Sequence, residues 1–205
     1  MVRLSLIIPI YLLDASLVQI TRDCLFSLKG QYDELVVVDD ASPLSSSWVK
    51  EEADTLIHHR TNQGFTRSVN DGLAVASGQY VCVANNDTQL LSGSLTDLCG
   101  NGYCFPRIEG KSKPFWDGAF FVVDRRLWQG DDPRFTNYFG DLDRFLKAKR
   151  EGIPLQRVDT VVVRHLEEQT SRKAGIRNTN FDVGKQLFEA KWGIPYDKAY
   201  AELEN

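Results

Sequence analysis

Gln79-Tyr80-Val81-Cys82-Val83-Ala84-Asn85-Asn86-Asp87-Thr88 is the stretch from which the fold is inferred. An apolar run with β-branched and aromatic residues ends here in three consecutive side chains that carry oxygen ligands. This is typical of a buried parallel strand with a polar cluster at its carboxyl end. Open α/β sheets bind ligands at that end. Asp87 can bind a hard divalent cation, and Asn85 can add a neutral oxygen. An Asn/Asp turn that caps a helix is the alternative interpretation.

The bulk composition predicts one globular domain. The 205 residues are 42% apolar and 25% charged, which is ordinary for a folded chain with a substantial core. A net charge of −4 gives no global electrostatic case for binding nucleic acid or anionic lipid. The longest early apolar run, residues 4–13, is too short to span a membrane. The four cysteines form no C-x-x-C pair, so we expect reduced packing residues in a cytoplasmic protein.

Strand and helix patterns alternate through the first ninety residues. Strands are predicted at 4–9, 34–38, 55–59 and 79–84, and helices at 14–29, 46–54 and 64–77. Pro9 is expected to end the first strand. This alternation favours an α/β fold with a parallel sheet, right-handed crossovers and helices on both faces.

In the second half, strands and helices no longer alternate regularly. A weak helix is predicted at 92–99, strands at 103–105, 118–123 and 158–163, a helical start at 124–128, a helix at 141–150, and helices at 180–192 and 196–203. We therefore expect one domain, 1–205, in three parts: a nucleotide-binding half (1–90), an acceptor and catalytic half (91–170) and a helical tail (171–205).

Polar residues suited to a nucleotide follow the predicted strands. Asp39-Asp40 can accept hydrogen bonds from a base or a ribose, although a simple turn would explain them equally well. Residues 62–67 open a helix with Gly64 and offer backbone N–H groups and Arg67 to anionic oxygens. Asn70-Asp71-Gly72 places unfavourable residues inside that helix. Neither a P-loop nor a Rossmann glycine fingerprint is present.

The order of these motifs resembles the family 2 glycosyltransferases of the GT-A fold. The resemblance covers residues 4 to about 170 and rests on the following series: Ile8-Pro9-Ile10-Tyr11, Val37-Val38-Asp39-Asp40-Ala41-Ser42, Asn62-Gln63-Gly64, Asn70-Asp71-Gly72, Asn85-Asn86-Asp87-Thr88, Gly118-Ala119, Phe139-Gly140-Asp141-Leu142-Asp143 and His165. It implies a Rossmann-like, mostly parallel sheet flanked by helices, with a smaller mixed half on the acceptor side.

The resemblance also implies a donor and a metal. The donor would be a nucleotide-diphosphate sugar, with Mn²⁺ or Mg²⁺ on its diphosphate. The implied metal ligands are Asp87, in the third position of the family's acidic metal motif, and His165. The implied donor-binding residues are Pro9, Tyr11, Asp39, Asp40, Asn62, Gly64, Arg67, Asn70, Asn85 and Asn86.

On the acceptor side, Asp141 matches the general base of inverting members, which would take the proton of the attacking hydroxyl. The glutamate that usually precedes this base is Gly140 here. A helix N-terminal acid favoured by the macrodipole is the alternative for Asp141. The resemblance extends the acceptor side to Trp116, Asp117, Gly118 and Asp143, where an indole beside a carboxylate suits a sugar face.

Two other function classes stay open from sequence. A sugar-phosphate nucleotidyltransferase would also use an α/β nucleotide cleft, but it would carry a glycine-rich, lysine-bearing signature that residues 6–14 lack. A non-catalytic nucleotide-sugar binding module is the second. The expected acceptor is a hydroxyl of a glycan, a lipid-linked sugar or a protein. A modified DNA base is a further alternative, supported only by the basic residues Arg164, Arg172, Lys173 and Arg177.

Overall fold

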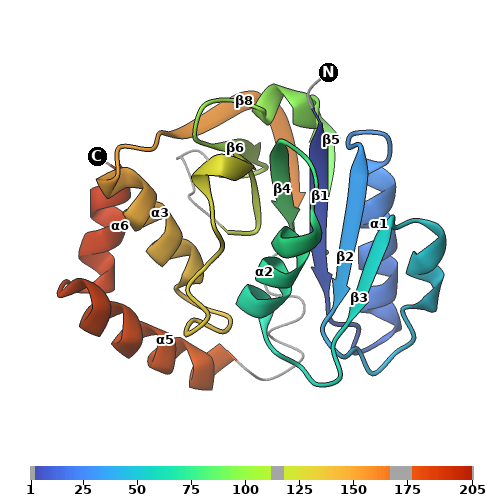
Figure 1. The fold of residues 1–205 in the computed structure, drawn as a ribbon, viewed down its shortest axis with the longest axis horizontal. Helices are drawn as coiled ribbons and strands as arrows, with labels where there is room; N and C mark the ends of the chain where they lie inside the picture. Colours follow the sequence, from blue (N-terminus) through green and yellow to red (C-terminus); the bar gives the residue numbers. More distant parts are fainter. Residues whose placement is uncertain (1–2, 112–117, 167–176, 205) are drawn as a thin grey trace.

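The computed structural model describes residues 3–111, 118–166 and 177–204. These residues form one eight-stranded mixed sheet with helices on both faces, shown edge-on in Figure 1. The strand order is β3-β2-β1-β4-β7-β6-β8-β5. The α/β fold class expected from the sequence is therefore confirmed.

The parallel half of the sheet comes from the first ninety residues. Its strands are β1 (Leu4–Ile10), β2 (Glu34–Asp39), β3 (Thr55–His58) and β4 (Tyr80–Ala84). β1 pairs in parallel with both β2 and β4, and β2 pairs with β3. Parallel strands end at the same edge of a sheet, so the residues that follow β2 and β4 are brought to one side of the molecule.

Alternate residues of these strands enter two separate cores. Leu6 and Ile8 face α1 (Ala15–Leu28), whereas Ile7 faces α2 (Phe65–Val75) and α3 (Gly140–Arg150). Strands buried on both faces read as continuous apolar runs, which explains why the sequence pattern located them. Figure 1 shows α1 on one face of the sheet and α2 and α3 on the other.

The second half contributes the mixed part of the sheet. Its strands are β5 (Thr88–Ser92), β6 (Tyr103–Ile108), β7 (Phe120–Asp124) and β8 (Leu155–His165). β7 runs antiparallel to β4 and β6, and β5 runs antiparallel to β8. The predicted helix at 92–99 is wrong: β5 comes first, and only a short 3₁₀ turn, Leu95–Leu98, follows it, capped by Ser94.

Pro9 does not end the first strand. It lies inside β1, paired with Val38, while the β1–β4 pairing ends at Ile7. A proline is tolerated there because this part of β1 has a neighbour on one side only. Short 3₁₀ turns also occur at Ser47–Glu51 and Arg125–Leu127, in place of the helices predicted around them.

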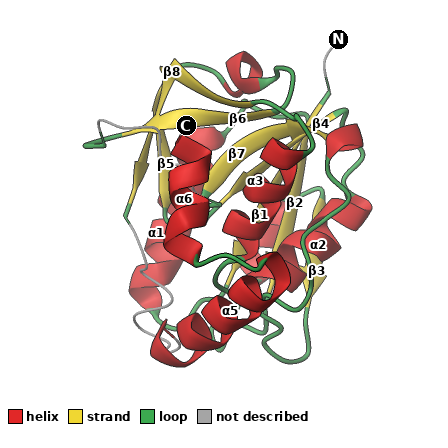
Figure 2. Ribbon diagram, turned by 90° about the vertical axis from the view of Figure 1, so that its left-hand side faces the viewer, coloured by secondary structure: helices red, strands yellow, loops and turns green. Residues whose placement is uncertain are grey.

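The chain closes with α5 (Arg177–Trp192) and α6 (Tyr196–Glu204). Figure 2 shows this helical pair in front of the sheet, beside α3. Arg150 of α3 pairs with Glu202 of α6 at 2.9 Å, and Phe188 and Leu203 enter the core that also contains Leu142. Among the described helices, none is both long enough and apolar enough to cross a membrane.

Candidate active site

Asp87 and His165 form the centre of the candidate site. Asp87 follows β4 and His165 ends β8, and the β5–β8 pairing places Thr88 opposite His165. As a result, His165 Nε2 lies 3.3 Å from Asp87 Oδ1, and both side chains are less than 10% exposed. The backbone N–H of Leu166 also donates to the Asp87 carbonyl at 3.0 Å. Pairing of two strands far apart in the sequence thus brings an imidazole and a carboxylate together.

The two asparagines before Asp87 face different ways. The Asn85 backbone accepts from the Thr88 N–H and hydroxyl, which folds residues 85–88 into a turn. The Asn85 Oδ1 atom is buried and has no hydrogen-bond partner among the described residues. The Asn86 amide donates to Thr21 of α1 at 2.8 Å and is buried against that helix. Asn85 therefore remains a candidate donor-site residue, whereas Asn86 has a packing partner.

The donor atoms of this centre fit Mn²⁺ or Mg²⁺ completed by a substrate. No group of three or more His, Cys, Asp or Glu side chains suited to a metal occurs in the described part of the chain. Asp87 and His165 would supply two ligands, a buried carboxylate oxygen and an imidazole nitrogen. Mg²⁺ is usually bound by one or two carboxylates plus substrate phosphates rather than by an all-protein cage. Two protein ligands would leave further coordination positions of such an ion open.

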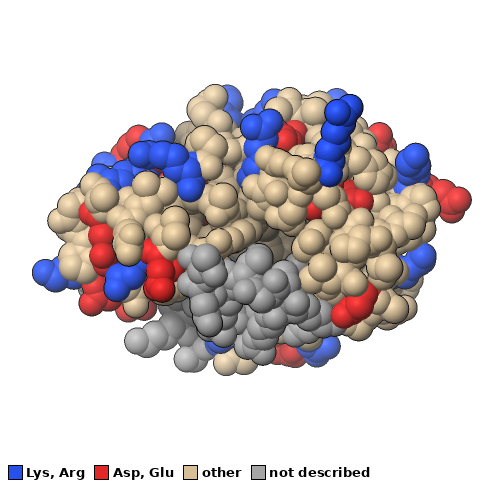
Figure 3. Space-filling model, turned by 90° about the horizontal axis from the view of Figure 1, so that it is seen from below, with Lys and Arg blue, Asp and Glu red and all other residues tan. Residues whose placement is uncertain are grey.

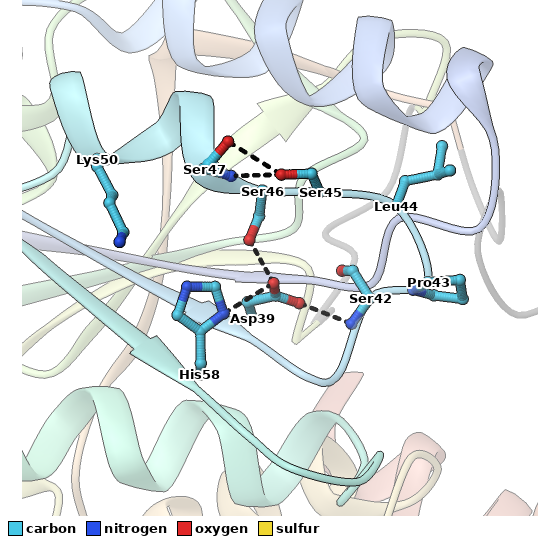
Figure 4. A pocket seen from close by; sticks show the side chains of 9 residues that line it. All are labelled: Asp39, Ser42, Pro43, Leu44, Ser45, Ser46, Ser47, Lys50 and His58. Carbon is cyan, nitrogen blue, oxygen red and sulfur yellow. Dashed lines mark hydrogen bonds and ion pairs between the residues drawn. The ribbon is translucent and has the colours of Figure 1, made fainter.

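A polar pocket lies at the carboxyl end of β2. It encloses about 380 Å³ and is lined by Asp39, Ser42, Pro43, Leu44, Ser45, Ser46, Ser47, Lys50 and His58. Figure 4 shows the Asp39 carboxylate between Ser42, Ser46 and His58. The backbone N–H of Ser42 donates to it at 2.8 Å, and His58 Nδ1 lies 3.1 Å away. A ligand in this pocket would meet a carboxylate that is fixed in place.

Asp40 has a structural environment instead. Its carboxylate accepts the backbone N–H groups of Gln63 and Gly64 at 2.7 and 2.8 Å. His59 Nδ1 lies 2.7 Å from the same carboxylate, and His59 Nε2 lies 3.1 Å from Asp71. Asn62 donates to the Asp40 carbonyl at 3.3 Å. Asp40 and Asn62 thus hold the loop before α2.

The start of α2 does not offer its N–H groups to an anion, contrary to the sequence prediction. The Gly64 N–H donates to Asp40, that of Phe65 to Asn137 Oδ1 at 3.0 Å, and that of Thr66 to the Thr136 carbonyl at 3.0 Å. A Cβ at Gly64, where φ is +86°, would lie 2.8 Å from the Thr136 oxygen. These contacts fasten α2 to the loop that leads into α3.

The remaining predicted donor residues are distributed along the same region. Arg67 is exposed and pairs with Asp71 at 2.8 Å. The Asn70 amide group is used twice on the Asp131 backbone: Nδ2 donates to the carbonyl at 2.9 Å, and Oδ1 accepts the N–H at 2.7 Å. Tyr11 follows β1 and is partly exposed, and Pro9 is buried within that strand.

Asp141 lies in the first turn of α3 and next to Gly118. The Gly118 N–H donates to Asp141 Oδ2 at 3.4 Å, and a Cβ at Gly118 would lie 2.8 Å from the Asp141 Cβ. Phe139, which caps this helix, has φ +70°, a left-handed conformation that is strained for an aromatic residue. The structure therefore brings Gly118 and Asp141 together. Trp116 and Asp117 lie outside the described residues.

Asp143 turns away from Asp141 and towards the C-terminal helix. Its carboxylate accepts from Trp192 Nε1 at 2.8 Å and pairs with Lys191 Nζ at 2.7 Å. Burial opposes the charge of Lys191, but its hydrogen bonds to Asp132 and Asp143 outweigh burial and raise the pKa of the ammonium. The acceptor role predicted for Asp143 stays a prediction, and the contacts observed join α3 to α5.

Replacing Asp143 with asparagine is expected to lower the free energy of unfolding by about 1.5–3 kcal/mol, because a charge-assisted hydrogen bond in a buried setting is lost. Chemical denaturation followed by tryptophan fluorescence measures this change. Asp197→Asn, an exposed carboxylate in α6, is the matched control and is expected to change stability by less than about 0.5 kcal/mol. Equal stability of the Asp143 variant and the wild type would show that the contacts of Asp143 with Lys191 and Trp192 do not stabilise the packing of α3 against α5.

The structure also reveals a buried ion pair that the sequence did not indicate. Arg144 Nε lies 3.0 Å from Asp131 Oδ1, and the two side chains are 3% and 1% exposed. Burial raises the pKa of Asp131, and the neighbouring Arg144 opposes that shift. Charged residues are almost never fully buried unless they are paired. From residue type alone, Asp131 and Arg144 would therefore be expected at the surface.

The predicted basic residues do not form a single described surface. Arg164 is paired with Glu109 at 2.6 Å, whereas Arg172 and Lys173 lie outside the described residues. Figure 3 views the side of the molecule to which β1 and β4 point, and blue Lys and Arg atoms are interspersed there with red Asp and Glu. The described part of this face offers no support for a polyanionic acceptor.

Comparison with known protein families agrees with this geometry. Residues 5–100, almost half of the chain, match the model of glycosyl transferase family 2. A TPR repeat-containing protein of Synechococcus elongatus is 33% identical over 91 residues. That match covers 40% of this chain and 23% of the relative, so less than a quarter of the length of that protein is matched.

Solved structures of similar fold include complexes with nucleotides or nucleotide sugars. A mannosyltransferase of Pyrobaculum calidifontis, in complex with GDP-Man and Mn²⁺, has a TM-score of 0.70 at 18% identity and covers 98% of this chain and 70% of that one. S. aureus TarS 1–349 with UDP-GlcNAc has a TM-score of 0.70 at 15% identity, covering 98% and 71%. Glucosyl-3-phosphoglycerate synthase of Mycobacterium tuberculosis, with Mn²⁺, UDP and phosphoglyceric acid, has 0.65 at 16%, covering 95% and 80%.

The fold is that of the GT-A glycosyltransferases. The likeness to the three solved structures shows the fold, and residues 5–100 match the model of glycosyl transferase family 2. The resemblance found in the sequence motifs is thereby confirmed.

Proposed function

We propose that this protein transfers a sugar from a nucleotide-diphosphate donor to an acceptor hydroxyl, with inversion at the anomeric carbon. The observation that carries the proposal is the buried Asp87–His165 pair at the carboxyl end of β4, 3.3 Å apart, in a GT-A fold. This pair and the Asp39 pocket follow β4 and β2, two parallel strands that end at the same edge of the sheet, an arrangement that suits a ligand with a base at one end and a diphosphate at the other.

In this reaction, the acceptor oxygen forms a bond to the anomeric carbon as the bond from that carbon to the diphosphate oxygen breaks. Asp141 accepts the proton of the acceptor hydroxyl, a role that needs a carboxylate in hydrogen-bond reach of the attacking group. Asp87 and His165 hold the divalent ion. When bound, that ion supplies charge stabilisation to the departing diphosphate. Asp39 accepts hydrogen bonds from the base or the ribose, and Asn85 adds a polar contact to the donor.

The related structures contain different nucleotide sugars. The Pyrobaculum enzyme was solved with GDP-Man and TarS with UDP-GlcNAc, so two bases occur among proteins of this fold. The Asp39 carboxylate can accept from either base, because uracil and guanine both present N–H donors. The acceptor is proposed as a hydroxyl of a glycan, a lipid-linked sugar or a protein.

A panel of UDP, dTDP and GDP sugars tests the proposal. Binding is measured by isothermal titration and turnover by release of the nucleoside diphosphate, each with Mn²⁺, with Mg²⁺ and with EDTA. We expect the nucleotide sugars of one base (uracil, thymine or guanine) to bind and to be hydrolysed slowly in the presence of metal. Binding without turnover in any condition would favour the non-catalytic module, and absence of both binding and turnover would contradict the proposal.

A further inference from the structure

A cation is buried on the helix that carries Asp141. Arg144 lies one turn after Asp141 on α3, and its side chain is 3% exposed. The guanidinium stacks over Phe121 of β7 at 4.2 Å from the ring centroid, over Phe145 at 4.8 Å and over Trp128 at 5.1 Å. Such contacts are strongest when the cation is desolvated. The aromatic rings surround this guanidinium and exclude water from it.

A single carboxylate balances this charge in the described part of the chain. Arg144 Nε lies 3.0 Å from Asp131 Oδ1, which also accepts from Trp128 Nε1 at 3.0 Å. The Asp131 backbone is in turn held at both its N–H and its carbonyl by Asn70 of α2. The ion pair therefore joins three elements: α3, the loop after β7, and α2 of the nucleotide-binding half.

One outer nitrogen of Arg144, Nη2, lies close to Gly118. Nη1 and Nη2 are buried and have no hydrogen-bond partner among the described residues. A Cβ at Gly118 would lie 3.5 Å from Nη2 and also 3.5 Å from the Asp141 Cγ, so those two atoms are at most twice that distance apart. Arg144 thus lies beside Gly118, the residue whose N–H donates to the proposed base.

We propose that Arg144, with Asp131 as its buried counter-ion, is a positioning residue that fixes Asp141 and Gly118 for proton transfer from the acceptor. The proposal rests on the function proposed above. A guanidinium is suited to the task because it stays charged when buried and presents its nitrogens in a rigid planar fork. A misplacement of a reacting group by about 1 Å can cost about 100-fold in rate, so a loosened α3 would lower kcat.

The test measures metal-dependent hydrolysis of the best-bound nucleotide sugar, with water as acceptor. Arg144→Met is expected to lower kcat by about 100-fold while the donor Kd changes by less than about threefold. Arg144→Lys keeps the charge but not the stacked fork and is expected to recover only part of kcat. Lys147→Met removes an exposed charge from the same helix and is the matched control.

A double variant separates positioning from folding. Arg144→Met alone leaves Asp131 buried and unpaired, which lowers the melting temperature. Arg144→Met with Asp131→Asn removes both charges, so thermal stability is expected to recover while kcat stays low. Recovery of kcat together with stability would overturn the positioning role. Wild-type protein that hydrolyses no donor would overturn the proposed function as well, whereas an active wild type with an active Arg144→Met variant would overturn this inference alone.

Discussion

Replacing Asp141 with asparagine is expected to reduce kcat by about a thousandfold while donor affinity stays within about threefold of wild type. Asparagine has nearly the same shape as aspartate but cannot accept a proton at neutral pH. Asp141 lies at the start of α3 against Gly118, in the mixed half of the sheet rather than next to the Asp39 pocket. The change is therefore expected to spare donor binding. Turnover and isothermal titration on the same preparation provide the two measurements.

Asp143→Asn is the matched variant, because Asp143 lies two residues after Asp141 in α3. Because its carboxylate bonds to Trp192 and Lys191, its main expected effect is on stability. At a temperature where both variants are folded, Asp143→Asn is expected to keep most of kcat. If Asp141→Asn were as active as wild type, or if both variants lost kcat equally, Asp141 could not be assigned as the base.

Replacing Asp87 with alanine is the second change with a large expected effect. It removes the carboxylate that faces His165 at 3.3 Å, and with it one of two proposed protein ligands of the metal. We expect metal-dependent turnover to fall by about a thousandfold or more and donor binding to lose its response to Mn²⁺. His165→Ala is expected to have the same sign and a smaller effect, since the anionic ligand remains. Donor titrations at several Mn²⁺ concentrations measure this response.

Asn86→Ala is the neighbouring control for Asp87. Its amide donates to Thr21 of α1, so the metal response is expected to remain even if stability decreases. Full metal dependence in Asp87→Ala would contradict the assignment of Asp87 as a ligand. If the metal response were lost in Asn86→Ala but kept in Asp87→Ala, Asn86 rather than Asp87 would be assigned as the ligand.

The parallel half of the fold was predictable because its signals are local. Buried strands such as β2 are continuous β-branched runs, and helices such as α1 have their own apolar stripe and cap. β5 was missed because Thr88–Ser92 is short and is stabilised by β8, which lies far along the chain. Asn85-Asn86-Asp87 is typical of a turn, so no strand was expected directly after it.

Parts of the site were unpredictable for a related reason. The sequence shows that α2 begins near Gly64, but not that Thr136 and Asn137 occupy its first N–H groups. Likewise, the direction of Asp143 depends on Trp192, which no local pattern connects to it. The Asp87–His165 pair was predicted through the order of family motifs, and strand pairing supplies the physical reason for it.

The β5–β8 pairing has a consequence for how the protein is made. Contacts between segments distant in sequence form late, since a long loop must close before they contribute. During synthesis, β1 to β4 are made before β8, so Asp87 is present in the chain before His165 can pair with it. The proposed metal site is complete only when β8 has joined the sheet. A truncated chain without β8 is therefore expected to lack the proposed metal site even if the Asp39 pocket has formed.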